Sequence, residues 1–300
     1  MKFNGFGACS CFVSLVGMVC AYMIVHQEMP TTSLAELGGS NIDFLTPFHM
    51  LLLRLVQGIV CWTSIIWLVI DKEGLHIDVD VRGEVKKVHL VHFSRFTPFT
   101  VWCWTLLSIY YVFAVYASYC VAYGTESSFN PLYIRITHLL FEISFAMAFL
   151  VTFIVTFVLL PAASRKGMRT DTFFYLLPLL FHNANVTFMT VEILTNNISI
   201  ELEHFPFVIL YGLAYILFSW VWFQYTGVFY YFFLDYEREY AILFYLGLVV
   251  CCTAFFFLGH GLSSLRDTKS PVVYLGITMF TYCITRVKDV YGRKSKKSSE

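Results

Sequence analysis

The stretch ITHLLFEISFAMAFLVTFIVTFVLLP, residues 136–161, decides the fold class of this chain. Glu142 is its only Asp, Glu, Lys or Arg side chain. A helix needs about 20 consecutive apolar residues to cross the hydrocarbon core of a membrane. The stretch is long and apolar enough to do so, and similar stretches elsewhere would make the chain a multi-pass membrane protein.

Six further stretches share this length and composition. They are Ala8–His26, Pro47–Ile70, Pro98–Tyr123, Thr172–Thr195, Pro206–Phe232 and Ala241–Ser263. A shorter one, Pro271–Thr285, either barely crosses the membrane or lies in its interface. The sequence therefore predicts an all-α, polytopic membrane helix bundle of about seven spans with a possible short eighth. The first stretch lacks a small-x-small cleavage site, so we expect an uncleaved anchor.

The overall composition excludes several classes of protein. Apolar residues make up 58% of the chain and charged residues 13%, against about 45–50% and about 25% in globular domains. A soluble or disordered chain is therefore not expected. Twenty basic residues balance twenty acidic ones, so nucleic-acid binding is not expected either. We expect an integral protein of the endoplasmic reticulum or plasma membrane with lipids as partners, and the oligomeric state stays open.

Basic residues in the loops predict the topology, because they favour the cytoplasmic side. The loops at 71–97 and 162–171 are rich in Lys and Arg, whereas those at 27–46 and 196–205 contain none. The alternation predicts a cytoplasmic N-terminus. Eight spans would place 16 basic residues inside and 3 outside, with Arg54 within a span. The charge rule thus favours eight spans, while the weak hydropathy of the last stretch favours seven.

Three regions follow from these patterns. Residues 1–45 form an N-terminal anchor helix and loop, residues 46–265 form the bundle, and residues 266–300 hold the short apolar segment and a basic tail, Arg293–Lys297. Within the loop 71–97, Leu75–Val81 alternates apolar and polar residues, Arg82-Gly83 is a turn signal, and Glu84–Leu90 alternates again. This pattern predicts a small hairpin, with an irregular loop as the alternative.

Ionisable and polar side chains at membrane depth mark functional sites by default. In the stretch Thr172–Thr195, His182, Asn185 and Glu192 fall on one helix face at about 100° per residue. In Pro206–Phe232 a second polar and aromatic stripe runs along one face. Its members are Tyr211, Tyr215, Ser219, Trp222 and Thr226. Such faces must turn inward, toward one another or a small wet cavity. The alternative is that these groups only hydrogen-bond helices together.

Thr100 begins a third polar face just after Pro98. A threonine hydroxyl is a weak nucleophile, and a neighbouring base must take its proton. Neutral histidine is the natural base near pH 7. A Thr–His pair inside the bilayer would meet substrates that dissolve there, such as acyl esters.

Three runs resemble one family of membrane proteins, over about residues 95–265. His182–Glu192 is similar to the His…Glu span of the androgen-induced-protein family of membrane hydrolases and the related rolling-stone-like proteins. Thr226–Asp235 resembles their Thr-Gly-x-aromatic segment, and Thr100–Tyr111 resembles their Thr-x-Trp helix, with Trp102 as its tryptophan.

The resemblance implies a Thr nucleophile at Thr100 and a His at His182, acting on fatty acid esters of hydroxy fatty acids in lipid metabolism. Asn185, Glu192, Tyr211, Tyr215, Trp102 and Thr226 would line or support the pocket. Thr97 is the competing threonine. The hydrolase branch has Asn where this chain has Cys103, and here the threonine helix is closer to the rolling-stone-like branch, which is associated with membrane fusion.

No metal or other cofactor is expected from sequence. A membrane di-iron site needs several histidine clusters, and the chain offers only His89-x-x-His92 on a loop. His138 and Glu142 stand one turn apart and are expected to pair with each other, with a proton relay as the alternative. Arg54 could pair with Glu142 or with Glu192.

Three functions remain open at this stage. The first is an enzyme, a Thr-dependent lipid esterase, and its activity is a hypothesis. The second is a non-enzymatic membrane protein of adhesion or fusion. The third is a proton-coupled transporter using buried His and Glu, which the lack of an internal repeat disfavours.

Overall fold

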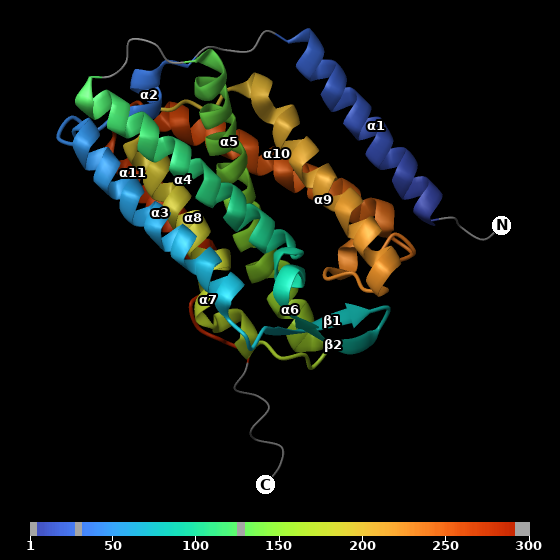
Figure 1. The fold of residues 1–300 in the computed structure, drawn as a ribbon. Helices are drawn as coiled ribbons and strands as arrows, with labels where there is room; N and C mark the ends of the chain where they lie inside the picture. The colour runs from blue at the N-terminus through green and yellow to red at the C-terminus, as the bar shows by residue number, and fades with distance from the viewer. Residues whose placement is uncertain (1–4, 28–31, 125–129, 292–300) are drawn as a thin grey trace.

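The computed structural model describes residues 5–27, 32–124 and 130–291 as a bundle of helices with one small β-hairpin at its end (Figure 1). The helices are α1 Gly5–His26, α2 Leu34–Gly38, α3 Pro47–Ile70, α4 Phe99–Tyr123, α5 Pro131–Ile154, α6 Leu160–Arg165, α7 Leu176–Leu179, α8 Asn185–Thr195, α9 Phe205–Thr226, α10 Ala241–Arg266 and α11 Pro271–Ile284. The strands are β1 Leu75–Val81 and β2 Glu84–Leu90. The basic tail Arg293–Lys297 lies outside the described residues.

Six helices in the described part of the chain are long and apolar enough to cross a membrane. They are Gly5–His26, Pro47–Ile70, Phe99–Tyr123, Pro131–Arg165, Leu202–Thr226 and Ala241–Arg266. They correspond to six of the seven stretches expected from the sequence. The fold is thus the expected all-α bundle, and it is compatible with a multi-pass membrane protein.

The remaining stretch, Thr172–Thr195, differs from a plain spanning helix and is not one of these six. It begins as a 3-10 turn, Asp171–Phe174, and α7 then joins α8 through a wide π turn, Leu180–Ala184. The hydroxyl of Thr152 on α5 donates a 2.6 Å hydrogen bond to the His182 carbonyl within this turn. A side chain that inserts into the helical ladder in this way supports a local widening. The last stretch forms α11, which has only 14 residues.

Helix α5 is the central element of the bundle. Asn130 caps its first turn, and Pro131 occupies a helix start, where its missing N–H costs nothing. The helix packs against α4, α8, α9 and α10, and its middle is buried on all sides, as expected for a helix apolar all round. A Cβ on Gly259 of α10 would lie 2.6 Å from the Phe145 ring, so only glycine allows this close approach of α10.

The chain passes back and forth between two ends of the bundle. At the hairpin end, the hairpin meets the loops 162–171 and 232–240: Asp80 binds Lys166 and Arg238, and Arg82 binds Asp235. At the opposite end, α2 and its flanking loop meet residues 195–204, with Ser40 pairing with Asn196. The two basic loops therefore share one end, and the loops without Lys or Arg share the other.

The predicted hairpin is confirmed, with the predicted turn. Strands β1 and β2 pair antiparallel, with Val81 opposite Glu84, so the loop has two residues. Arg82 and Gly83 both have positive φ, of 54° and 98°, which fits the right-handed twist of a two-residue hairpin. Burial alone would raise the pKa of the Asp80 carboxyl, but hydrogen bonds from Lys166, the Gly83 N–H and Arg238 hold that pKa below its usual value. The hairpin is thus fastened to the bundle by charged hydrogen bonds.

Candidate functional site

A cavity of about 470 Å³ lies between the hairpin and the end of the helix bundle. Thr100 from α4 and His182 from the π turn both line it, although they are far apart in sequence. The wall toward the bundle carries apolar side chains. Toward the hairpin and the loop 162–171 the lining includes charged groups: Glu73, Asp78, Asp80, Lys166 and Arg169. Such a cavity suits a ligand with one polar and one apolar part.

A second, smaller cavity of about 60 Å³ lies deeper, between α4, α5, α9 and α10. Its lining is apolar apart from a few hydroxyl and thiol groups, and three residues also line the first cavity: Thr100, Leu159 and Tyr231. Thr100 therefore stands where the two spaces approach each other. An extended molecule reaching from one space toward the other would pass its hydroxyl.

The start of α4 sets the position of Thr100. Pro98 is the N-cap residue, so Thr100 is the second residue of the helix. The backbone N–H groups of Phe99 and Thr100 belong to a first turn, whose donors have no partner within the helix. Tyr231 lies close to Thr100 and to the Phe99 backbone, and it lines both cavities together with Thr100. Sequence reasoning quoted Tyr231 only inside a motif and gave it no role.

Thr97, the competing threonine, is buried and already bonded. Its hydroxyl donates to the Ser94 carbonyl (2.6 Å) and lies 2.7 Å from the Tyr230 hydroxyl. Its own carbonyl accepts a hydrogen bond from Tyr215 (3.1 Å). This threonine thus joins the loop before α4 to the segment after α9.

His182 presents an unused atom. Its Nδ1 is buried and has no hydrogen-bond partner within the described residues. The ring lies 5.9 Å from that of Phe173, with which it lines the first cavity. In the tautomer that carries its hydrogen on Nε2, this Nδ1 is a free lone pair, as a general base requires.

Asn185 and Glu192 do not share the site of His182, contrary to expectation. Asn185 Oδ1 accepts from Thr152 (3.2 Å), and its amide donates to the Ala148 carbonyl (3.3 Å), so it joins α8 to α5. Glu192 lies about 15 Å further along, at 1.5 Å per residue. A shared face therefore does not bring His182 and Glu192 together, and the π turn Leu180–Ala184 also changes the direction of His182 relative to α8.

The other expected supporting residues divide between packing and surface. Tyr215 lines the deeper cavity and binds the Thr97 carbonyl. Trp102 packs on Tyr215, with ring centroids 5.3 Å apart, and Tyr211 contacts Cys103; neither lines the first cavity. Thr226 is exposed and donates to the Trp222 carbonyl of its own helix. Of these four residues, only Tyr215 lines a cavity together with Thr100.

Arg54 pairs with Glu192, which resolves the alternative left open by the sequence. Both side chains are fully buried, and their two hydrogen bonds are 3.0 Å long. The remaining donors of Arg54 reach the Leu37 carbonyl and Ser118. Tyr110 donates to the second oxygen of Glu192 (2.9 Å). The network is filled and touches neither cavity, so it joins α2, α3, α4 and α8 rather than performing chemistry.

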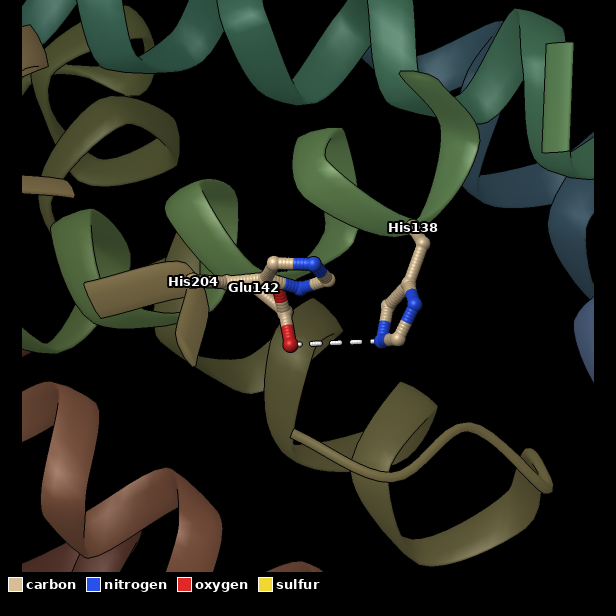
Figure 2. Close-up of side chains that lie close together, drawn as sticks. All are labelled: His138, Glu142 and His204. Atoms are coloured by element: carbon tan, nitrogen blue, oxygen red, sulfur yellow. Dashed lines mark hydrogen bonds and ion pairs between the residues drawn. The ribbon is translucent and has the colours of Figure 1, made fainter. Parts of the chain in front are cut away.

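A second cluster of buried groups lies at the opposite end (Figure 2). His138 and Glu142 pair as expected, with 3.2 Å between Nε2 and Oε1. The structure adds His204, whose Nδ1 lies 2.7 Å from Glu142 Oε2. Each of the three offers a ligand atom within 4.8 Å of the others. Sequence reasoning missed the cluster because only the fold brings His204, at the start of α9, beside α5.

No family model, no curated protein and no solved structure matches this chain. The resemblance described above therefore rests on its quoted motifs alone.

Proposed function

We propose that this chain is a multi-pass membrane hydrolase that cleaves fatty-acyl esters, with Thr100 as nucleophile and His182 as base. The observation that carries the proposal is their placement in the wall of one cavity, with His182 Nδ1 unpartnered. The motif resemblance to the androgen-induced-protein hydrolases supports the same two roles.

The reaction would proceed in two balanced steps. Thr100 Oγ1 attacks the acyl carbon while the His182 imidazole takes the hydroxyl proton. The ester C–O bond then breaks, the alcohol leaves with the proton from the imidazolium, and an acyl-threonine remains. Water attacks this acyl group with His182 again as base, which releases the fatty acid and restores Thr100.

The two cavities suggest how the substrate is held. The acyl chain would occupy the deeper apolar space, and the alcohol portion would lie toward the charged lining under the hairpin. The oxyanion that develops at the carbonyl needs donors close to Thr100. The groups near that position are the Tyr231 hydroxyl and the N–H groups of Phe99 and Thr100, since the N–H groups of Val101 and Trp102 donate to the Pro98 carbonyl.

The proposed topology has eight passes with the hairpin end in the cytoplasm. The placement of both basic loops at that end supports this topology. The end of α11 also lies toward the hairpin end, because the Ile284 carbonyl accepts from Thr156 and the Arg286 N–H donates to Asn183 in the π turn. Fourteen residues rise about 21 Å, which requires local thinning or snorkelling if α11 crosses. The endoplasmic reticulum or plasma membrane is the proposed location.

Hydrolysis by the purified protein tests the proposal. In detergent micelles, wild type should release fatty acid from an ester of a hydroxy fatty acid and p-nitrophenol from its acyl ester. Thr100→Ala and His182→Ala should each lower turnover by about 10²–10⁴-fold or more, the range of a general base. Thr187→Ala, an exposed hydroxyl on α8, is the matched control and should keep wild-type turnover.

Two outcomes would contradict the proposal. Loss of turnover in Thr97→Ala together with full turnover in Thr100→Ala would show that Thr97, and not Thr100, is the nucleophile. If folded wild-type protein hydrolyses neither ester, the hydrolase proposal is wrong, and a non-enzymatic function in adhesion or fusion becomes the favoured alternative.

A further inference from the structure

Glu142 is a fully buried carboxylate that has no arginine or lysine partner among the residues that the structure describes. Its oxygens accept from the Glu201 N–H (2.7 Å) and from His204 Nδ1 (2.7 Å). His138 Nε2 lies 3.2 Å from Oε1 and 2.8 Å from the Ser199 carbonyl. Glu201 also lies close enough to interact electrostatically with His138. The cluster therefore gathers negative charge and neutral nitrogen ligands in a place from which water is excluded. Buried charges of this kind are paired or coordinate metals.

His204 supplies a second, independent observation. Its side chain is almost fully buried, and its Nε2 has no hydrogen-bond partner in the described part of the chain, while Nδ1 serves Glu142. The ring nitrogen that faces Glu142 is Nδ1, so a cation shared with that carboxylate would replace the hydrogen on Nδ1. A metal-bound histidine usually passes its other nitrogen to a carboxylate or hydroxyl, and His138 has such a contact through Nδ1 to Thr32 (2.7 Å).

We propose that His138, Glu142 and His204 bind one divalent transition-metal ion, with zinc as the best fit. Two imidazoles and a carboxylate within 4.8 Å are a known zinc donor set, and imidazole also suits copper, nickel and iron. The metal would fasten α5 to the turn that begins α9, across the loop 196–204. Its role would be structural, since no side chain of the three is exposed.

This site is distinct from the proposed esterase. His138 and Leu159, which lines both cavities, are separated by about 30 Å along α5 and its continuation, at 1.5 Å per residue. A failure of the metal proposal would therefore leave the hydrolase proposal untouched, and the reverse also holds.

Cobalt binding tests the metal site in the full-length protein. After chelator treatment in detergent micelles, Co²⁺ should produce visible d–d absorption at about one equivalent per chain, and Zn²⁺ should displace it. The chain also has nine cysteines, which could bind cobalt themselves. If the metal is bound by the histidines and Glu142 instead, the near-ultraviolet region should show no thiolate-to-cobalt charge transfer. Zn²⁺ should also raise the melting temperature of the wild type.

Variants locate the bound metal. Glu142→Gln keeps the shape of the side chain but removes its charge, and His204→Ala removes the imidazole that faces it. Both should lose at least about tenfold in Co²⁺ affinity, as expected for a lost ligand. His260→Ala is the matched control, because His260 also contacts the loop, through the Ile200 carbonyl (2.6 Å), without joining the cluster.

The proposal would be overturned in either of two ways. Folded wild-type protein could show neither cobalt absorption nor a zinc-dependent melting shift, in which case the cluster is only a hydrogen-bonded network. Alternatively, the cobalt spectrum could survive in both variants, or show thiolate charge transfer, which would place the metal elsewhere. The wild-type titration decides the first point even if a variant does not fold.

Discussion

The two ends of the bundle handle buried polar groups in opposite ways. At the hairpin end, Thr100 and His182 line a cavity of about 470 Å³, and a nitrogen of His182 has no hydrogen-bond partner within residues 5–27, 32–124 and 130–291. At the opposite end, Arg54 and Glu192 fill each other's hydrogen-bonding capacity inside closed packing. Space and an unused lone pair favour chemistry, whereas a filled network favours stability.

The opposite end itself contains two carboxylates that differ. Glu192 has a permanent cation in Arg54, whereas Glu142 has only imidazoles and an N–H. The difference teaches that a buried carboxylate is not by itself a sign of catalysis. Its counter-charge decides whether it is already balanced or still requires a cation.

The largest expected effect on stability comes from Arg54. Arg54→Met leaves Glu192 buried without its cation and should lower the free energy of unfolding by about 3–5 kcal/mol. Replacing both residues by Met should recover most of that loss, because a well-packed apolar pair avoids the buried charge. Denaturant unfolding in micelles measures both variants. A loss below about 1 kcal/mol in Arg54→Met would show that the network does not stabilise this end.

A smaller effect is expected at the hairpin end, from Asp80. Asp80→Asn removes charged hydrogen bonds with Lys166 and Arg238 and should cost about 1.5–3 kcal/mol of local stability. Amide hydrogen exchange over residues 75–90 measures this loss, with Glu84→Gln, an exposed carboxylate on the same hairpin, as control. Unchanged exchange in Asp80→Asn would contradict the account of hairpin docking.

The same carboxyl predicts how the docked hairpin responds to pH. The folded-state pKa of Asp80 lies below the ordinary value of about 3.9. Its stabilising contribution is therefore complete above that value and is lost as the pH falls through the lower, folded-state pKa. Asp80→Asn should abolish this acid dependence of exchange in the hairpin. An equally steep acid response in the variant would assign it to another group.

A third prediction concerns the deeper cavity. The nearest atom to a Cβ on Gly212 is Cys252 Sγ, at 3.9 Å, so Gly212→Val fits without a clash at that carbon and fills part of the space. Turnover of long-chain esters should fall about tenfold relative to acetate esters, since each lost methylene contact weakens binding. Gly247→Val, at an open position on α10, is the control. An unchanged chain-length preference would show that the acyl chain does not bind in this cavity.

The smallest effect is expected for Thr226. It is exposed, donates to the Trp222 carbonyl and accepts a long hydrogen bond (3.3 Å) from the Val228 N–H, so Thr226→Ala should change stability by no more than about 0.5 kcal/mol and leave turnover unaltered. Unfolding and ester hydrolysis measure the two quantities. A large loss of turnover would show that Thr226 supports the catalytic site despite its exposed position.

Hydrophobic length and loop charge predicted much of the fold. Six helices of spanning length, the common end of the two basic loops and the Arg82-Gly83 hairpin all follow from local patterns in the chain. The fifth stretch was not predictable in detail, because its π turn depends on Thr152 from another helix, which hydrogen-bonds the His182 carbonyl.

The candidate site was predictable only in part, for the same reason. The residue types of Thr100 and His182 suggested a nucleophile and a base, but their shared cavity is a tertiary fact. The expected common face of His182, Asn185 and Glu192 does not make one site, because Glu192 lies about 15 Å further along the axis and Asn185 bonds to Thr152 and Ala148. His204 and Tyr231 could not be assigned, because no spacing in the sequence shows which distant helix they meet.

Covalent labelling with a fluorophosphonate probe tests the central claim most directly. Wild-type protein in micelles, digested and analysed by mass spectrometry, should carry the phosphonate on Thr100. Labelling should disappear in Thr100→Ala and fall steeply in His182→Ala, while Thr187→Ala labels as wild type. A phosphonate on another residue, or equal labelling of wild type and Thr100→Ala, would contradict the assignment of Thr100 as an activated nucleophile.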